Sequence, residues 1–461
     1  MKNGMSPSLA WAAPLVHGEL WGGDVLLPLP VVVDSRLIKD GEAFLALKGE
    51  HHDGHRFIGE ALDRGAKVFF GEREGLMPWR DRFARSGAAA LAFSRDSEAS
   101  FVDLARLYLE EVAPQTILAI TGSVGKTTCR ELTALVLAKR FRVHQARKSH
   151  NTALGCALTV LAMDSATEML LLEMGCNHRG EIAEMVDLFP PHLAVITEVA
   201  PAHLEGLGSI EGVLRAKLEI LRSRNLRAVS YNIDNDALRQ AMASFSREVD
   251  ILSVGYHREA IFRLVQTTQD QDEEGVRLFV RAHYEGGEME LASRLFGRHH
   301  AYSMGFAGAV ASYLGIDDFG SAFRDQRSLT GRGRVLSRRQ GGVVVDESYN
   351  ANPLSMRAAL TAFREVAGAE GNWALLGAMG ELGPTSADLH RLLLSEAPLP
   401  ERVLLLGEGW PATLPPGARR VAGADEAIAL LTEEMAPGEA LLVKGSRLWK
   451  LERVVQKALS L

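Results

Sequence analysis

Residues 117–139 of the chain, ILAITGSVGKTTCRELTALVLAK, decide the fold. The apolar residues Ile117–Ile120 predict a buried strand that ends at a glycine-rich turn. From Lys126 to about Lys139, apolar residues recur with the spacing of a helix. A strand, a tight turn and a helix in this order open an α/β unit, so a mostly parallel sheet is expected.

The turn between this strand and helix has the composition of a phosphate-binding loop. Its expected nucleotide contacts are Gly122, Ser123, Val124, Gly125, Lys126, Thr127 and Thr128. Glycines let backbone N–H groups face an anion, and the helix N-terminus adds partial positive charge. Lys126 can reach the β- and γ-phosphates, and the Thr127 hydroxyl can hold Mg²⁺. The common pattern would place its first glycine at Ile120, so a chance glycine-rich turn is the alternative interpretation.

Strands and helices alternate along the rest of the chain. Three domains are expected: a small α/β unit over residues 1–112, a central phosphate-loop unit over 113–327, and a Rossmann-like unit over 328–461. Pro114 marks the first junction. The polar stretch Thr267–Glu274 is expected to be a surface hairpin loop.

Bulk properties exclude several classes of protein. The formal charge of −7 argues against a nucleic-acid partner, because binding phosphate backbones requires a basic surface. The three cysteines are an odd number without metal-ligand spacing, which argues against disulfides and favours a reducing compartment. No apolar run approaches the roughly 20 residues of a membrane helix, and no basic-then-apolar signal opens the chain. We therefore expect a cytoplasmic enzyme.

Three ionisable residues follow the central strands. Glu173 ends an apolar strand, where a carboxylate faces the crevice in which α/β proteins bind ligands. His203 follows the next strand, and Lys217 lies on a predicted helix. Each has an ordinary alternative: a solvated or paired glutamate, a surface histidine and a solvated lysine.

Together with the shortened loop Thr-Gly-x-x-Gly-Lys-Thr-Thr, this series resembles the Mur ligase family. The resemblance implies that ATP and two Mg²⁺ ions bind, with Thr127, Glu173 and His203 among the metal ligands. It also implies that Lys217 reacts with CO₂ to form a carbamate, an anion that serves the second metal. Oxygen ligands suit a hard cation, and an unmodified lysine would be repelled by it.

The start of the chain extends the resemblance. Asp34-Ser35-Arg36, the segment Phe44–Gly49 and Asp53-Gly54-His55-Arg56-Phe57 are similar to the UDP-sugar-binding first domain of the later members of the family. The implied substrate contacts are Ser35, Arg36, Lys48, Asp53 and His55. An ordinary turn-rich domain is the alternative, because Asp-Gly turns are common.

The centre and the end carry further matching segments. His150–Gly155 and Glu173–Ile182 resemble segments that line the substrate cleft, and Gly297–His300 resembles one near the adenine. Gly331-Arg332 is similar to the opening of the third domain, and Asp346–Pro353 is the most specific match. The implied nucleotide contacts are His299, Arg332 and Asn350. The implied substrate contacts are Asn151, Thr152, Asn177, Tyr349, Asn352, Lys444, Ser446 and Arg447.

Four positions depart from the family pattern. Thr152, His300 and Ser303 each replace an asparagine, and Ala378 replaces an aspartate. These changes leave the adenine contacts and the exact acceptor open.

For activity, the resemblance implies a monomeric, ADP-forming ligase with catalytic Lys126, Glu173, His203 and Lys217. It would join D-alanyl-D-alanine to UDP-N-acetylmuramoyl-tripeptide through an acyl phosphate in peptidoglycan synthesis. The alternatives are a Mur-type ligase that adds another amino acid or peptide, and a phosphate-loop module without ligase chemistry.

Overall fold

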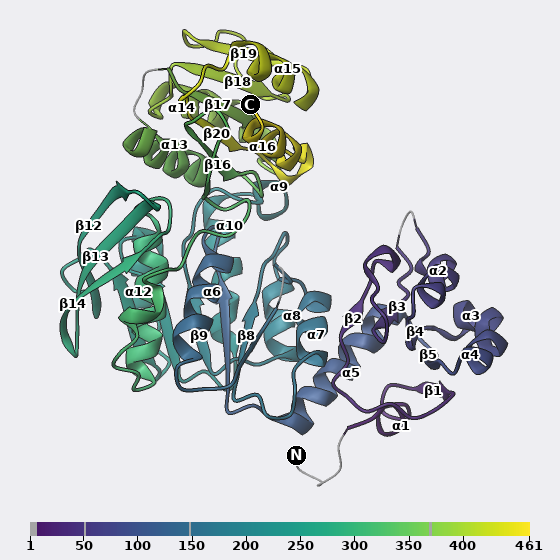
Figure 1. Ribbon diagram of the computed structural model, residues 1–461. Coiled ribbons are helices and arrows are strands. Elements are labelled where there is room, and N and C mark those ends of the chain that lie inside the picture. Colours follow the sequence, from purple (N-terminus) through teal and green to yellow (C-terminus); the bar gives the residue numbers. More distant parts are fainter. Residues whose placement is uncertain (1–6, 50–51, 147–148, 368–370) are drawn as a thin grey trace.

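The computed structural model describes residues 7–49, 52–146, 149–367 and 371–461, which form three sheets (Figure 1). The first sheet has the order β1-β5-β4-β3-β2, and its strands are parallel except for β1. Its strands are β1 (Gly18–Trp21), β2 (Val31–Val32), β3 (Ala43–Leu45), β4 (Val68–Glu72) and β5 (Ala89–Phe93). Its main helices are α2 (Ile58–Asp63), α4 (Arg80–Ser86) and α5 (Ser97–Val112).

The second sheet has nine strands in the order β14-β13-β12-β11-β10-β9-β6-β8-β7. Its parallel part comprises β6 (Thr116–Thr121), β7 (Val143–Gln145), β8 (Met169–Glu173), β9 (Leu193–Ile196), β10 (Ala228–Asn232), β11 (Asp250–Gly255) and the first residues of β12 (Phe262–Asp272). The strands β13 (Gly275–Tyr284) and β14 (Gly287–Ser293) continue it antiparallel. The expected mostly parallel central sheet is confirmed.

Alternate residues of β6 face opposite layers of helices, as strand geometry requires. Leu118 and Ile120 belong to a core shared with α6 (Lys126–Leu137) and α12 (His300–Tyr313). Ile117 and Ala119 belong to the core shared with α7 (Ala153–Leu161) and α8 (Glu181–Leu188). That second core continues through α5 into the first sheet, so the first two units are packed on each other.

The third sheet has the order β15-β16-β20-β17-β18-β19, and only β15 is antiparallel to its neighbour. Its strands are β15 (Arg334–Ser337), β16 (Val343–Glu347), β17 (Trp373–Gly377), β18 (Arg402–Leu406), β19 (Ala418–Val421) and β20 (Leu441–Lys444). One face carries α13 (Pro353–Ala367) and α14 (Ser386–Glu396), and the other carries α15 (Ala424–Glu434) and α16 (Glu452–Leu459). This is the doubly wound arrangement expected for the third unit, so the three-domain α/β fold is confirmed; the exact boundaries stay predictions.

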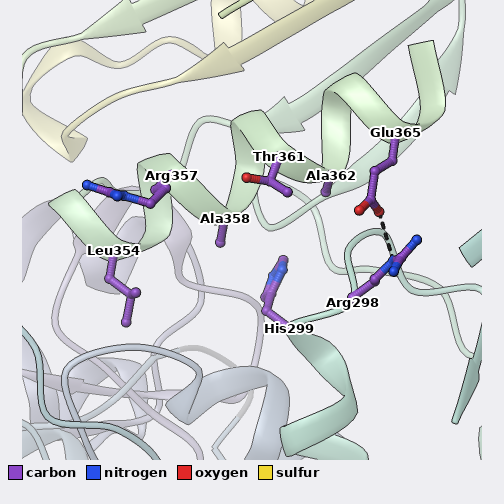
Figure 2. A pocket seen from close by; sticks show the side chains of 8 residues that line it. All are labelled: Arg298, His299, Leu354, Arg357, Ala358, Thr361, Ala362 and Glu365. Atoms are coloured by element: carbon purple, nitrogen blue, oxygen red, sulfur yellow. Dashed lines mark ion pairs between the residues drawn. The ribbon is translucent and has the colours of Figure 1, made fainter. Parts of the chain in front are cut away.

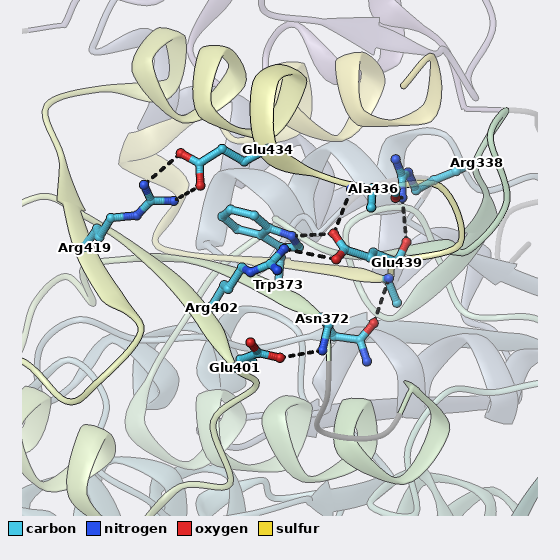
Figure 3. A network of polar contacts seen from close by, with 11 residues as sticks. Arg338, Asn372, Trp373, Glu401, Arg402, Arg419, Glu434, Ala436 and Glu439 are labelled. Carbon is cyan, nitrogen blue, oxygen red and sulfur yellow. Dashed lines mark hydrogen bonds and ion pairs between the residues drawn. The ribbon is translucent and has the colours of Figure 1, made fainter.

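A polar network fastens one end of this third sheet (Figure 3). The Glu439 carboxylate accepts hydrogen bonds from Trp373 Nε1 at 2.8 Å, Arg402 Nη1 at 3.0 Å and the Ala436 N–H at 2.9 Å. The backbone oxygen of Glu439 accepts another from Arg338 Nη1 at 2.6 Å. The Glu439 charge is therefore matched within the fold.

The polar stretch Thr267–Glu274 differs from the expected loop. Residues up to Asp272 are part of β12 and pair with β13, and the turn begins only at Glu273. Many side chains of this stretch are exposed, so their polarity is compatible with a solvent-facing strand. Among the residues described, no helix is long and apolar enough to cross a membrane.

Candidate functional site

The phosphate loop is held in shape by the segment after β9. Gly122 has a φ of +143°, and a Cβ added there would lie 2.1 Å from Thr197 Oγ1, so only glycine fits. The Thr197 hydroxyl contacts the Val124 carbonyl oxygen at 2.5 Å. Ser123 donates its hydroxyl to the Ala200 carbonyl at 2.9 Å. The loop is therefore preformed by contacts between β6 and the neighbouring strand end.

Lys126 begins α6 and folds back over this loop, where Nζ donates to the Gly122 carbonyl at 2.6 Å. Desolvation lowers the pKa of Lys126 to about 8, and the positive charge of the nearby Lys217 acts in the same direction. Two lysines close enough to repel each other make a site that favours an added anion.

Glu173 ends β8 as predicted, yet it is not a free carboxylate. It is 1% exposed, and Arg130 Nη1 lies 3.1 Å from its Oε1. Its Oε2 accepts a hydrogen bond from the Thr127 hydroxyl at 3.2 Å. The structure therefore brings two predicted metal ligands, Thr127 and Glu173, into contact beside the phosphate loop.

Lys217 is buried on α10 (Ile210–Leu218), and its Nζ lies 3.1 Å from Cys176 Sγ. This is not the solvated lysine of the ordinary alternative. Cys176 follows β8 by a few residues, so Lys217 faces the same strand end as Glu173.

His203 lies on the seam between the second and third units, where its side chain contacts Glu381. Its Nδ1 is 2.5 Å from Glu381 Oε2, and the backbone N–H of Glu205 donates to the Glu381 carbonyl at 3.2 Å. Both His203 and Glu381 have left-handed backbones, with φ of 53° and 61°. Among the described residues, no cluster of three or more His, Cys, Asp or Glu side chains forms a ready-made metal site.

The third unit reaches the phosphate loop through Arg332. Its Nη2 donates to Ser149 Oγ at 3.0 Å, and Ser149 Oγ lies 3.1 Å from Thr127 Oγ1. The Arg332 guanidinium lies 4.0 Å from the centre of the Tyr349 ring, and that of Arg447 lies 5.5 Å from it. Four residues predicted to act at the site, Thr127, Arg332, Tyr349 and Arg447, thus lie together in space.

A pocket separates His299 from helix α13 (Figure 2). Its lining residues are Arg298, His299, Leu354, Arg357, Ala358, Thr361, Ala362 and Glu365. Arg298 is held by Glu365, with Nε 3.0 Å from Oε2. The rings of His299 and His300 are 4.2 Å apart, and burial lowers the pKa of each, so both are neutral at pH 7.

Comparison with known proteins covers all three units. Three family models match in sequence: Mur ligase family, catalytic domain, over residues 31–105; Mur ligase middle domain over 120–311; and Mur ligase, glutamate ligase domain, over 331–447. A UDP-N-acetylmuramoyl-tripeptide–D-alanyl-D-alanine ligase of Mycobacterium bovis is 31% identical over 470 residues, covering 90% of this chain and 89% of the relative.

The chain belongs to the Mur ligase family.

Two further comparisons agree with this membership. The UDP-N-acetylmuramoyl-tripeptide–D-alanyl-D-alanine ligase of Bacillus subtilis is 29% identical over 440 residues, covering 92% of each chain. The crystal structure of the MurF ligase from Thermotoga maritima in complex with ADP superposes with a TM-score of 0.77 at 25% identity, covering 93% of this chain and 97% of that one.

In this Mur ligase, the predicted contacts of the first domain gather at turns around α2. Ser35 donates to Glu60 on α2 at 2.7 Å, and Lys48 pairs with Asp53 in an isolated backbone bridge. Arg36 is exposed and pairs with Asp34 at 2.8 Å.

Both ring nitrogens of His55 are hydrogen-bonded within the first domain. Its Nε2 accepts from the Glu72 N–H at 3.1 Å, so Nδ1 is the ring nitrogen that donates to Asp53 Oδ1 at 2.7 Å. Both ring nitrogens are engaged inside the protein, which makes the ring a structural support in this arrangement.

The predicted contacts of the central cleft lie between α7 and the end of β8. Asn151 accepts from the Gly175 N–H at 2.8 Å through its carbonyl, and the Thr152 hydroxyl caps α7 by accepting from the Gly155 N–H at 3.2 Å. The backbone N–H of Asn177 donates to Glu181 at 2.8 Å. A threonine in place of asparagine thus serves as a helix cap here.

The residues predicted to contact substrate in the third domain differ in their partners within the protein. Lys444 is buried, 2.8 Å from Glu347 Oε2 and 3.1 Å from the carbonyl of Asn350, so its charge is already matched. Asn352 caps α13 by accepting from the Ser355 N–H at 2.9 Å. Ser446 follows β20 next to the loop that contains Gly380.

Four residues of the site escaped prediction: Arg130, Ser149, Cys176 and Glu381. Arg130 had a usable signal, because it lies four residues after Lys126 on the same helix and therefore near the same face. Cys176 lies inside the segment Glu173–Ile182, which resembles a cleft-lining segment of the family, but no role was predicted for it. Ser149 and Glu381 contact partners from other elements, which no local pattern indicates.

Proposed function

We propose that this chain is the ATP-dependent ligase that joins D-alanyl-D-alanine to UDP-N-acetylmuramoyl-tripeptide. The observation that carries the proposal is the match along about nine-tenths of its length to ligases that bear this name. The substrates and ATP are metabolites of the cytoplasm, which is where we place the enzyme.

Activation of the carboxylate is the first chemical problem, because oxide is a poor leaving group. An oxygen of the tripeptide carboxylate attacks the γ-phosphorus of ATP, the bond to the β–γ bridging oxygen breaks, and ADP leaves. Lys126 and Arg332 supply fixed positive charge where negative charge accumulates on the transferring group. The amine of D-alanyl-D-alanine then attacks the acyl carbonyl, loses a proton and expels phosphate.

Magnesium fits the donors next to the loop. The Thr127 hydroxyl and the Glu173 carboxylate are hard oxygen ligands 3.2 Å apart, and they would hold the cation beside the phosphates. Bound there, Mg²⁺ would neutralise phosphate charge during the transfer. His203, on the domain seam, is the further ligand we propose for the second ion.

We further propose that the Lys217 amine is carbamylated. The amine would add to CO₂ and release a proton, which replaces a buried cation by an anion. The surroundings support this change, because the positive charge of Lys217 lies close enough to Lys126 to lower the pKa of Lys126. The charge reversal would relieve that repulsion and add an oxygen donor near Glu173.

The Lys217→Ala variant tests the carbamate. We expect its ADP release to fall by about 10²-fold or more, since a metal-site anion is lost. Short carboxylic acids such as acetate should restore part of the rate by occupying the vacated space. Full activity without any added acid would remove Lys217 from the mechanism.

Contacts between the second and third units support a reaction shielded from water. Arg332 contacts Ser149, and Glu381 contacts His203, at two separate points of the seam. Excluding water matters because an acyl phosphate hydrolyses readily. The pocket between His299 and α13 lies on this seam, and we propose that the adenine binds there or directly beside it.

The acceptor is tested by ADP release with UDP-N-acetylmuramoyl-tripeptide and a panel of amines. D-alanyl-D-alanine should give the highest rate. A higher rate with a single amino acid would favour the alternative, a Mur-type ligase with another acceptor, which the departures at Thr152 and Ala378 leave open. Purified protein that bound ATP but released no ADP with any acceptor would support a nucleotide-binding module instead.

A further inference from the structure

A hydroxyl that the family resemblance did not single out joins the third domain to the phosphate loop. Ser149 follows β7 and precedes α7, and its Oγ has two neighbours. Arg332 Nη2 lies at 3.0 Å and Thr127 Oγ1 lies at 3.1 Å. Thr127 in turn lies 3.2 Å from Glu173 Oε2. These contacts form a continuous chain from Arg332 to Glu173.

The hydrogen positions along this chain follow from what each group can donate. A guanidinium N–H only donates, so Ser149 Oγ accepts from Arg332. An ionised carboxylate only accepts, so Thr127 uses its single hydrogen toward Glu173. The Ser149 hydrogen is then the one that lies between Ser149 Oγ and Thr127 Oγ1. Every hydrogen bond therefore runs in one direction, from the third domain toward the phosphate loop.

This order leaves the Thr127 hydroxyl oxygen with one unused lone pair. A hydroxyl oxygen has two lone pairs, and Thr127 accepts one hydrogen bond, from Ser149. Its hydrogen points to Glu173, so the remaining lone pair is available to a cation. Without Arg332, the Ser149 hydroxyl would lose its donor and could rotate, and the Thr127 hydroxyl would lose its fixed orientation.

Arg332 itself is well anchored in the third domain. Its backbone N–H donates to the Leu329 carbonyl at 2.9 Å, and the N–H of the preceding Gly331 donates to Asp346 at 2.9 Å. The Tyr349 ring lies 4.0 Å from its guanidinium. Arg332 is therefore fixed to the third domain and is not a freely rotating side chain.

We propose that Ser149 is a positioning residue that couples contact of the third domain to the orientation of the Thr127 hydroxyl. The proposal rests on the proposed function, because it assigns that hydroxyl to Mg²⁺ and phosphate binding. Ser149 is partly exposed and not part of the core, so its substitution tests the coupling without dismantling the fold.

The test compares Ser149→Ala, Ser149→Cys and Ser149→Thr by calorimetric binding of a non-hydrolysable ATP analogue with Mg²⁺. Losing a charge-assisted hydrogen bond predicts about a tenfold higher Kd for Ser149→Ala, and nearly as much for the size-matched Ser149→Cys. Ser149→Thr keeps the hydroxyl and should stay within about threefold of the parent protein. Thr330→Ala is the matched control, because it removes an exposed hydroxyl close to Arg332 that accepts a hydrogen bond from Arg334 at 3.1 Å.

A double-substitution cycle decides whether Ser149 acts through Arg332. In an Arg332→Ala background, adding Ser149→Ala should raise the Kd by less than about twofold, since the chain is already broken. The same tenfold loss in both backgrounds, or no loss in the parent protein, would overturn the proposal. Analogue binding needs neither the muramyl peptide nor the acceptor, so a failed ligase assay with intact coupling would refute the proposed function alone.

Discussion

Two ionic clusters of this protein have opposite characters. Around Glu439 the carboxylate is matched by Arg402, by the Trp373 N–H and by a backbone N–H. At the phosphate loop, neither Lys126 nor Lys217 makes an ion pair with a carboxylate among the described residues, and the pKa of Lys126 is lowered to about 8. A matched cluster stabilises the fold, whereas an unmatched one favours the binding of an anion.

The largest effect should follow from removing the unmatched charge. Lys126→Ala should lower kcat/KM by about 10³-fold, since a cation at the transferring phosphoryl group is lost. The melting temperature should change little, because the substitution breaks no ion pair and removes one hydrogen bond, from Nζ to the Gly122 carbonyl. ADP release and thermal unfolding measure the two quantities.

Lys139 offers a matched control for this substitution. It lies just beyond the other end of α6, where its Nζ is 3.0 Å from Asp318. Lys139→Ala should keep nearly full activity. If Lys126→Ala unfolds the protein instead of inactivating it, the two clusters do not differ in the way described.

Stability should respond to the matched cluster. Glu439→Ala leaves Arg402 and Trp373 without their acceptor, which predicts a loss of about 3 kcal/mol in the free energy of unfolding. Activity per folded molecule should not change. Urea unfolding gives the first value and ADP release the second.

Glu434 is the control for this second substitution, because it ends α15 and pairs at 2.7 Å with Arg419 on β19 of the same domain (Figure 3), but is exposed to water. Glu434→Ala should change stability little, since exposed ion pairs contribute little. Equal losses for the two glutamates would show that burial does not distinguish them.

The smallest effect is proton uptake on nucleotide binding. With a pKa of about 8, Lys126 is half protonated at pH 8 in the free protein. Polyphosphate raises that pKa, so binding ADP at pH 8 should take up about half a proton, and less as the pH falls toward 7. Calorimetry in buffers of different ionisation enthalpy measures this number. In Lys126→Ala the uptake should disappear, and unchanged uptake would assign it to another group.

The sequence was informative where structure is local. The phosphate loop follows from a strand, two glycines and a helix start that are consecutive in the chain. The pairing of Glu173 with Arg130 and that of His203 with Glu381 arise from packing between distant segments, which no local pattern encodes. The polarity of Thr267–Glu274 led to the wrong prediction of a loop, whereas residues up to Asp272 form a strand. A solvent-facing strand tolerates the same polar residues as a loop.

Gly122 has a consequence for drug resistance. Any side chain at this position would collide with the Thr197 hydroxyl and break the contact that holds the Val124 carbonyl. A substitution of Gly122 would therefore not give resistance to an inhibitor that binds at this turn, because the altered protein would also bind ATP poorly.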